Sequence, residues 1–298
     1  MKGIKEIKTV SEYDEMFGQE TLHPLVSIID FSQAGVLMDQ PLNLGFYSIL
    51  FKTERVCPIK YGRNDYDYQA GTLLFIAPGQ VMSFEEDGLE HRPKGYALVF
   101  HTDLLNGTSL GQQIRNYNFF SYDVHEALHL SEDEKRSVIE NFKKIEYELK
   151  RPIDKHSKQL IVSNIELFLN YCVRFYDRQF LTRDYSGNGV IEKFDRLLNE
   201  YFTSEKLQSD GLPSVAYFAN EFHLSANYFG DLIKKETGKT ALEHIQGKLI
   251  NLAKEKVFEA KQSVSAIAYE LGFKYPQHFT RFFKKQVGFT PNEYRSIN

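Results

Sequence analysis

Residues 266–295 read AIAYELGFKYPQHFTRFFKKQVGFTPNEYR, and the spacing of their apolar positions predicts two short helices joined by a tight turn. The pair Gly272-Phe273 supplies the turn. The second helix is expected from about Tyr275 to Gly288, because glycine adopts the left-handed conformation that ends a helix at the least cost.

An earlier stretch repeats this pattern, with an offset of 49 residues in its first half and 50 in its second. Phe218-Ala219 corresponds to Ile267-Ala268, and Lys234-Lys235 corresponds to Lys284-Lys285. Such self-similarity predicts a duplicated supersecondary unit, here helix-turn-helix. Serines are placed to cap three of the four helices: Ser214, Ser225 and Ser263.

A single long helix is predicted between the two copies. Thr240 and Glu243 form a capping box, and residues 240–258 contain no proline and only Gly247 as a helix breaker. Nineteen helical residues span about 28 Å, within reach of the ~34 Å between successive major-groove faces on one side of B-DNA. One chain could therefore place two helices in adjacent grooves.

The stretches SANYFGDLIKKETGKTALEHI (residues 225–245) and 266–295 resemble the DNA-binding domain of the AraC/XylS transcription regulators. The resemblance covers residues 190–298, about a third of the chain. It implies promoter DNA as the partner, a homodimer, contact with RNA polymerase by an activator or repressor, and a small-molecule effector bound by a cupin-like amino-terminal domain. A ligand-independent DNA-binding regulator stays open as an alternative.

Exposed positions early in the second helix of each copy would face base edges, because Arg suits guanine and Gln or Asn suits adenine. The candidates for base contact are Ala226, Asn227, Gln277, His278, Thr280 and Arg281. Phosphate contacts are expected from basic side chains and from helix amino-terminal amides near Ser225 and Tyr275. The basic candidates are Lys234, Lys235, Lys284, Lys285 and Arg295.

Three positions depart from the family pattern. Gly230 and Asp231 stand in copy one where relatives often carry longer polar or basic groups, and Pro276 in copy two offers no side-chain hydrogen bond. Copy two is therefore expected to dominate affinity.

Net charge is divided unevenly along the chain. The whole chain carries −4, residues 1–189 carry −6 and residues 190–298 carry +2. The last 28 residues alone carry +4, which suggests an anionic partner for the carboxyl-terminal part.

The amino-terminal part reads as short strands, which suggests an antiparallel sandwich or barrel. The expected strands are residues 25–31, 45–51, 71–77, 81–84 and 95–101, with 71–84 as a hairpin around Pro78-Gly79. The expected fold class is α+β: a cupin-like antiparallel β-barrel with a helical pair, then an all-α double helix-turn-helix domain.

Two amphipathic helices follow the strands. The first is capped by Ser131 and Glu134 and ends near Pro152. The apolar stripe expected on the second consists of Leu160, Ile161, Ile165, Phe168, Cys172 and Phe175. These faces pack within the chain or form a dimer seam. The predicted boundaries are 1–130 for the effector domain, 131–182 for the helical pair, 183–189 for the linker and 190–298 for the DNA-binding domain, which an introductory helix at 190–202 opens.

The strongest enzymatic alternative is a metal-dependent cupin, which needs a His-x-His pair that this sequence lacks. Met82 stands where a metal-binding cupin would offer His, so no metal, cofactor or catalytic residue is predicted. The barrel interior could instead bind an effector through aromatic and apolar side chains, or these could be plain core. The candidate lining residues are Phe46, Tyr47, Tyr66, Met82, Phe84 and Tyr96.

Composition predicts a cytoplasmic protein without a membrane partner. The 298 residues contain no apolar run approaching the roughly 18 that a membrane span needs, and the charged amino terminus lacks an apolar export segment. Cys57 and Cys172 fit no metal or redox spacing.

Overall fold

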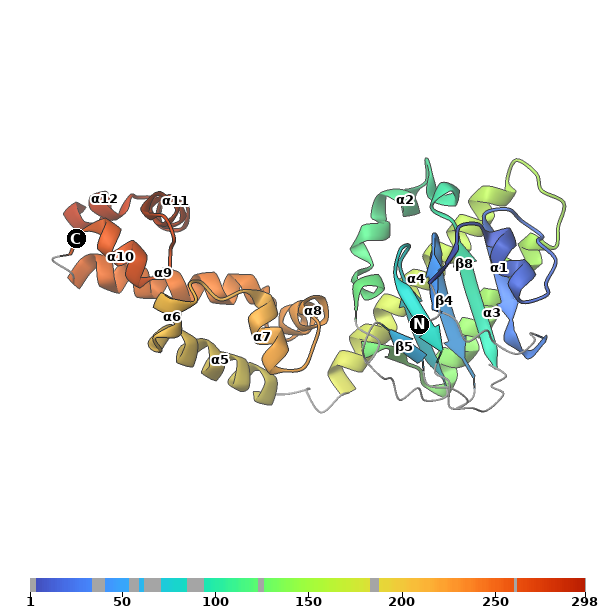
Figure 1. Cartoon of the computed structure of the whole chain (residues 1–298), viewed down its shortest axis with the longest axis horizontal. Helices are drawn as coiled ribbons and strands as arrows, with labels where there is room; N and C mark the ends of the chain where they lie inside the picture. The colour runs from blue at the N-terminus through green and yellow to red at the C-terminus, as the bar shows by residue number, and fades with distance from the viewer. Residues whose placement is uncertain are drawn as a thin grey trace. The chain divides into compact units, whose positions relative to one another are not determined.

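The computed structural model describes residues 4–33, 41–53, 59–61, 71–84, 94–122, 126–182, 188–259 and 262–297. The chain divides into two compact units, residues 1–179 and residues 180–298 (Figure 1). Residues 183–187, most of the predicted linker, lie outside the described residues.

The first unit contains two β-sheets. One has the strand order β1 (Lys5–Ile7), β3 (Leu42–Leu44), β7 (Val81–Phe84) and β5 (Ile59–Tyr61). The other has the order β2 (Val26–Asp30), β8 (Gly95–Phe100), β4 (Tyr47–Lys52), β6 (Thr72–Ile76) and β9 (Leu128–His129). β1 and β3 pair in parallel, and all other pairs are antiparallel. The α+β class is confirmed, but the predicted cupin-like barrel is not closed: the described strands form two sheets, as in the sandwich that the sequence also allowed.

The predicted hairpin at 71–84 is also wrong, because β6 and β7 belong to different sheets. The turn itself is present, with Gly79 at φ 85° and its N–H donating to the Leu44 carbonyl at 2.8 Å. Both edges of β6 are already taken by β4 and β9, so the chain after the turn crosses to the other sheet.

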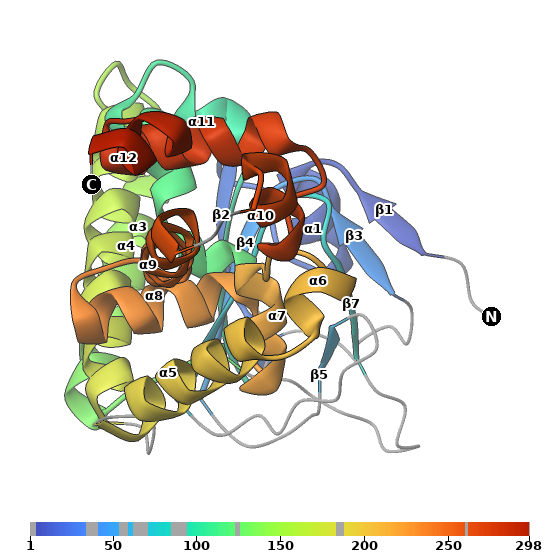
Figure 2. The ribbon, with the colours of Figure 1, turned by 90° about the vertical axis from the view of Figure 1, so that its left-hand side faces the viewer.

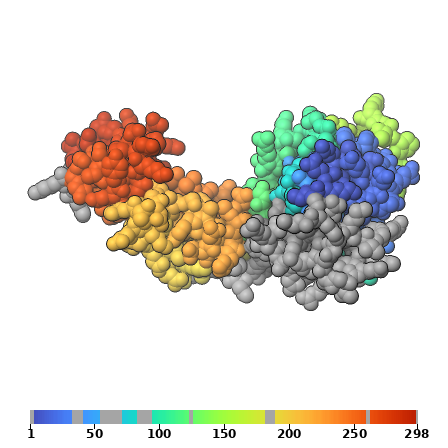
Figure 3. Space-filling model, viewed as in Figure 1, coloured from blue at the N-terminus to red at the C-terminus, as the bar shows by residue number. Residues whose placement is uncertain are grey.

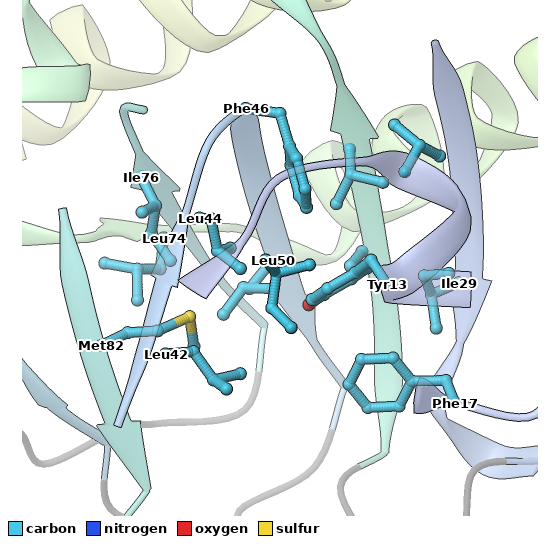
Figure 4. Packing of buried hydrophobic residues seen from close by; sticks show 14 of the residues in the cluster. Tyr13, Phe17, Ile29, Leu42, Leu44, Phe46, Leu50, Leu74, Ile76 and Met82 are labelled. Atoms are coloured by element: carbon cyan, nitrogen blue, oxygen red, sulfur yellow. The ribbon is translucent and has the colours of Figure 1, made fainter. Parts of the chain in front are cut away.

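An apolar core fills the space between the two sheets in the described part of the unit. Leu50, Leu74 and Met82 point into it from β4, β6 and β7, and Tyr13 enters from α1 (Val10–Met16) (Figure 4). Side chains alternate along a strand. Leu73 and Phe75 of β6 are therefore on the opposite face, and the Phe75 ring lies 6.1 Å from Tyr176 of the fourth helix.

Two long helices, α3 (Glu132–Leu149) and α4 (Ser157–Thr182), pack on that opposite face of the five-stranded sheet. The capping box of Ser131 and Glu134 is confirmed. In α4 the predicted apolar stripe is buried except for Leu160, which is 46% exposed. This correction follows from the helical period. Leu160 shares one face of α4 with Asn164 and Leu167, and this face lies beside the buried stripe.

Short helical segments complete the first unit. They are η1 (Phe31–Gln33), η2 (Thr102–Leu105), α2 (Ser109–Gln113), η3 (Ile114–Asn116) and η4 (Asn118–Ser121). No helix among the described residues is both long enough and apolar enough to cross a membrane. Cys172 is a buried free thiol, and Cys57 lies outside the described residues.

The described residues of the second unit form helices and connecting turns without a strand, in one continuous body from α5 to α12 (Figure 3). Its helices are α5 (Asn188–Thr203), α6 (Lys206–Ser209), α7 (Val215–Glu221), α8 (Ala226–Thr237), α9 (Ala241–Glu259), α10 (Val264–Glu270), α11 (Pro276–Val287) and α12 (Pro291–Ile297). The introductory helix and the repeated pair of helices therefore appear where the sequence predicts them.

Candidate nucleic-acid interface

Helix caps set the boundaries of both helix-turn-helix copies, α7–α8 and α10–α11. The Ser225 hydroxyl accepts from the Tyr228 N–H at 3.2 Å at the start of α8. Gly238 at φ 72° and Gly288 at φ 89° end α8 and α11 in the left-handed conformation. These predicted boundaries are confirmed.

Aromatic side chains hold each copy against its neighbours. In the first copy, the Phe194 ring of α5 packs edge-on against Phe218 and Phe229, each at 5.3 Å. In the second, the buried Phe283 ring of α11 packs edge-on against Tyr294 of α12 at 5.5 Å. These buried faces fix which sides of α8 and α11 remain exposed.

The connecting helix α9 joins the two copies within one unit. It contacts α5 and α8 on the side of the first copy and α10, α11 and α12 on the side of the second, and Figure 2 shows it end-on with α8 below it and α11 above it. Its amino terminus carries the predicted box: the Thr240 N–H donates to Glu243 at 2.7 Å, which lowers the pKa of that carboxyl. At 19 residues, α9 has a length of about 28 Å.

The exposed side of α11 carries a row of polar and basic side chains. Arg281 follows Gln277 by one helical turn and precedes Lys284 by another, so the three share one face. The members of this row, all exposed, are Gln277, His278, Arg281, Lys284 and Lys285. Phe279 and Phe283 are buried on the opposite side of the helix.

The exposed side of α8 carries fewer polar and basic side chains than that of α11. Ala226, Asn227, Lys234 and Lys235 are exposed. Between them lie Gly230 and Asp231, both half-buried, so the middle of this surface lacks a long basic side chain.

Three predicted contact residues have polar atoms engaged within the protein. Besides the cap made by Ser225, the Thr280 hydroxyl donates to the Pro276 carbonyl at 3.2 Å. The Arg295 guanidinium Nε donates to the Val257 carbonyl at 3.0 Å and is half-buried. This places Arg295 at the end of α9 as a stabilising contact, apart from the row on α11.

Sequence reasoning missed the ring of Tyr275 as a site candidate. It is 55% exposed at the start of α11 and lies edge-on to His278 with ring centroids 5.4 Å apart. The sequence signal for it was available: Tyr275 directly precedes Pro276, the first residue of α11, so its ring lies at the helix start.

The structure does not bring the candidate effector residues together. Phe46 and Met82 are buried in the core between the sheets. Tyr47 and Tyr96 lie on the opposite face of the five-stranded sheet, where Tyr47 stacks on Phe100 at 5.1 Å and Tyr96 is edge-on to Phe142 at 6.5 Å. Tyr66 and the side chain of Phe84 lie outside the described residues.

Comparison with known proteins places the second unit in a family. The family model described as a helix-turn-helix domain matches residues 218–297. The chain is 32% identical over 123 residues to the uncharacterized transcriptional regulatory protein YesN of Bacillus subtilis (strain 168), covering 41% of this chain and 32% of that protein. The second unit therefore carries a helix-turn-helix domain of the AraC type.

Two further comparisons also match only part of the chain. It is 29% identical over 108 residues to the HTH-type regulator YobQ of Bacillus subtilis (strain 168), covering 32% of this chain and 45% of that protein. The solved carboxyl-terminal domain of the response regulator yesN from Fusobacterium nucleatum is 22% identical, with a TM-score of 0.32, over 36% of this chain and 98% of that one. The chain thus spans less than half the length of these curated relatives.

No group of three or more His, Cys, Asp or Glu side chains suited to a metal ion occurs in the part of the chain that the structure describes. His101 accepts from the Asp103 N–H at 3.2 Å through its ring nitrogen, as the cap of a short helix. His91 and His125 lie outside the described residues.

Proposed function

We propose that this protein is a non-enzymatic transcription regulator that binds promoter DNA by placing α8 and α11 in neighbouring major grooves. The observation that carries the proposal is the pair of helix-turn-helix copies joined by α9. The length of α9, about 28 Å, suits the ~34 Å repeat of B-DNA.

The second copy supplies most of the affinity in this proposal. Arg281 and Gln277 read base edges, because guanidinium and amide groups match the hydrogen-bonding edges of guanine and adenine. Lys284 and Lys285 contact phosphates and displace counterions. The first copy contributes less, since Gly230 and Asp231 occupy the middle of the α8 surface.

Regulation by a small-molecule effector bound to the first unit belongs to the same proposal, as do dimerisation and contact with RNA polymerase. The α4 surface supports a dimer seam: Leu160 and Leu167 share one face of the helix and are 46% and 42% exposed. Isolated large apolar side chains are ordinary at a surface, but two on one face make α4 the first place to test for a second copy of this chain.

The test compares Arg281→Ala with Lys284→Ala. Preferred sites are selected from random DNA with the full-length protein, and affinities for a selected site and for random DNA are measured over a range of salt concentrations. We expect Arg281→Ala to weaken binding to the selected site by about 1 to 3 kcal/mol with little effect on random DNA. Lys284→Ala should weaken both and reduce the salt slope by about 1.

Arg136→Ala is the matched control, because Arg136 is an exposed arginine of α3 in the first unit. It should leave both affinities unchanged. Equal effects of Arg281→Ala on selected and random DNA would contradict base reading, and unaltered binding by both α11 variants would contradict the interface itself.

A further inference from the structure

A cleft of about 480 Å³ opens in the first unit between α3 and the edge of the five-stranded sheet, away from the core between the two sheets. β2 is the edge strand and α3 packs against it. The volume falls within the range of about 300 to 1,000 Å³ found for small-molecule sites.

The floor of the cleft is aromatic and aliphatic. Tyr96 of β8 and Phe142 of α3 lie edge-on, 6.5 Å apart, and both line the cleft with Ile28. Asp30 pairs with Tyr96 in the register of β2 and β8, so its carboxylate is on the same face of the sheet as the tyrosine ring.

Two carboxylates line the cleft from different elements, Asp30 from β2 and Glu146 from α3. Burial raises the pKa of Tyr96, and the negative charges of Asp30 on the sheet and Glu146 on α3 raise it further. Asp30 Oδ1 accepts from the Ser32 N–H at 2.9 Å, and its second oxygen has no hydrogen-bond partner among the described residues. The cleft therefore presents an acceptor pair beside an aromatic ring.

The lysines of the cleft offset this pair only in part. The Lys150 ammonium binds one oxygen of Glu146, Oε1, at 2.6 Å, and Lys143 is exposed on α3. A third carboxylate, Glu20, lines the side formed by the loop after α1. Carboxylates thus outnumber ammonium groups, which favours a cationic ligand over an anionic one.

We propose that this cleft binds a small organic amine, with its ammonium group between Asp30 and Glu146 and its apolar body over Tyr96 and Phe142. The ammonium gains charge-assisted hydrogen bonds from the carboxylates and attraction from the ring face. The claim that this ligand is the effector of the regulator rests on the proposed function. The claim that it binds to the cleft does not.

Three probes of similar shape and different charge test the proposal on the full-length protein by isothermal titration calorimetry: 2-phenylethylamine, 2-phenylethanol and phenylacetate. We expect the amine to bind, the alcohol to bind at least tenfold more weakly and the acid not to bind. Asp30→Asn and Glu146→Gln should each weaken amine binding at least tenfold. Asp133→Asn, an exposed carboxylate of α3 outside the cleft, is the control and should leave it unchanged.

The outcomes separate this inference from the DNA proposal. Absence of amine binding at 10 mM, equal binding of the three probes, or unchanged binding by folded Asp30→Asn protein would overturn the cleft assignment. DNA affinity of the ligand-free protein is measured in parallel. Amine binding by a protein that binds no DNA would reject the regulator alone, and DNA binding without amine binding would reject the cleft alone.

Discussion

At the scale of single residues, the two helix-turn-helix copies make the same turn with different residues. His223 takes φ 55° in the first copy, and Gly272 takes φ 78° at the corresponding place in the second. A left-handed conformation is strained for a residue with a Cβ atom, so the first copy carries a local strain that the second avoids. The sequence predicts the same helix-turn-helix pattern in both copies, and the structure shows that His223 adopts the conformation that Gly272 adopts in the second.

Gly272→Ala should destabilise the second unit far more than Gly238→Ala, although both glycines have positive φ. A Cβ at Gly272 would lie 2.5 Å from the Leu207 carbonyl oxygen, whereas nothing lies within 4 Å of a Cβ at Gly238. Gly238→Ala should cost about 1 kcal/mol from conformation alone, and Gly272→Ala at least twice that because backbone must move. Thermal unfolding of the full-length variants measures the difference; similar losses would show that the close approach is unimportant.

Most side chains of the candidate interface could be predicted from sequence, since exposure on a short amphipathic helix follows from its period. The contact made by Arg295 could not be predicted in this way. Its partner, the Val257 carbonyl, lies 38 residues away, and only packing of α12 on α9 brings them together.

At the scale of elements, the helices begin at the caps that the sequence predicts. A side chain at such a cap can also connect its helix to another element. Glu134 completes the predicted cap of α3 by accepting from the Ser131 N–H at 2.7 Å. The same carboxylate also receives two hydrogen bonds from Arg178 of α4, at 3.0 and 2.7 Å. Arg178 in addition donates to the His129 carbonyl at 2.5 Å, so one guanidinium joins α4, α3 and β9.

Arg178→Ala should therefore lower the stability of the first unit by about 1 to 3 kcal/mol, the range for hydrogen bonds to charged groups that leave a partner unsatisfied. Glu134 is only 13% exposed, so water replaces the lost contacts poorly. Arg136→Ala removes an exposed ion pair with Asp133 on the same helix and should cost less than about 1 kcal/mol. Urea unfolding compares them, and equal losses would mean that the link between α3 and α4 adds little.

Strands were less predictable than helices at this scale. The segments that became β2, β4, β6, β7 and β8 were expected, but the short strands β1, β3, β5 and β9 were missed. β1 has three residues and β9 has two, which is too short to show the alternation of apolar and polar residues that predicts a strand. Strand partners depend on which edges are already occupied, and this is why β6 and β7 do not form the expected hairpin.

At the scale of the whole molecule, ionisable groups at helix ends should make stability depend on pH. Hydrogen bonds from the backbone of Thr240 and Thr290 lower the pKa of Glu243 and Glu293, and the hydrogen bond from Lys256 at 2.8 Å lowers that of Glu270. A carboxyl whose pKa is lower in the folded state stabilises the fold above its unfolded pKa, and this contribution disappears as pH falls through the folded value.

The triple variant Glu243→Gln, Glu270→Gln and Glu293→Gln tests this effect. We expect it to be less stable than the wild type at pH 6, with the difference shrinking steadily as the pH falls from 5 to 3. Unfolding midpoints of the two full-length proteins, measured by circular dichroism at each pH, give the difference directly. A difference that stays constant over this range would contradict the assignment.

The sequence by itself determined the repeated helix-turn-helix unit, its caps and the exposed faces of α8 and α11. These features depend on local backbone preferences and on a period of 3.6 residues, and both are determined by residues close together in the sequence. Only the tertiary structure decided that the strands form two sheets, that Phe46 and Tyr96 lie on opposite faces, and that a cleft opens beside Asp30. Those outcomes depend on which distant segments compete for the same strand edge and the same apolar surface, and no local pattern records that competition.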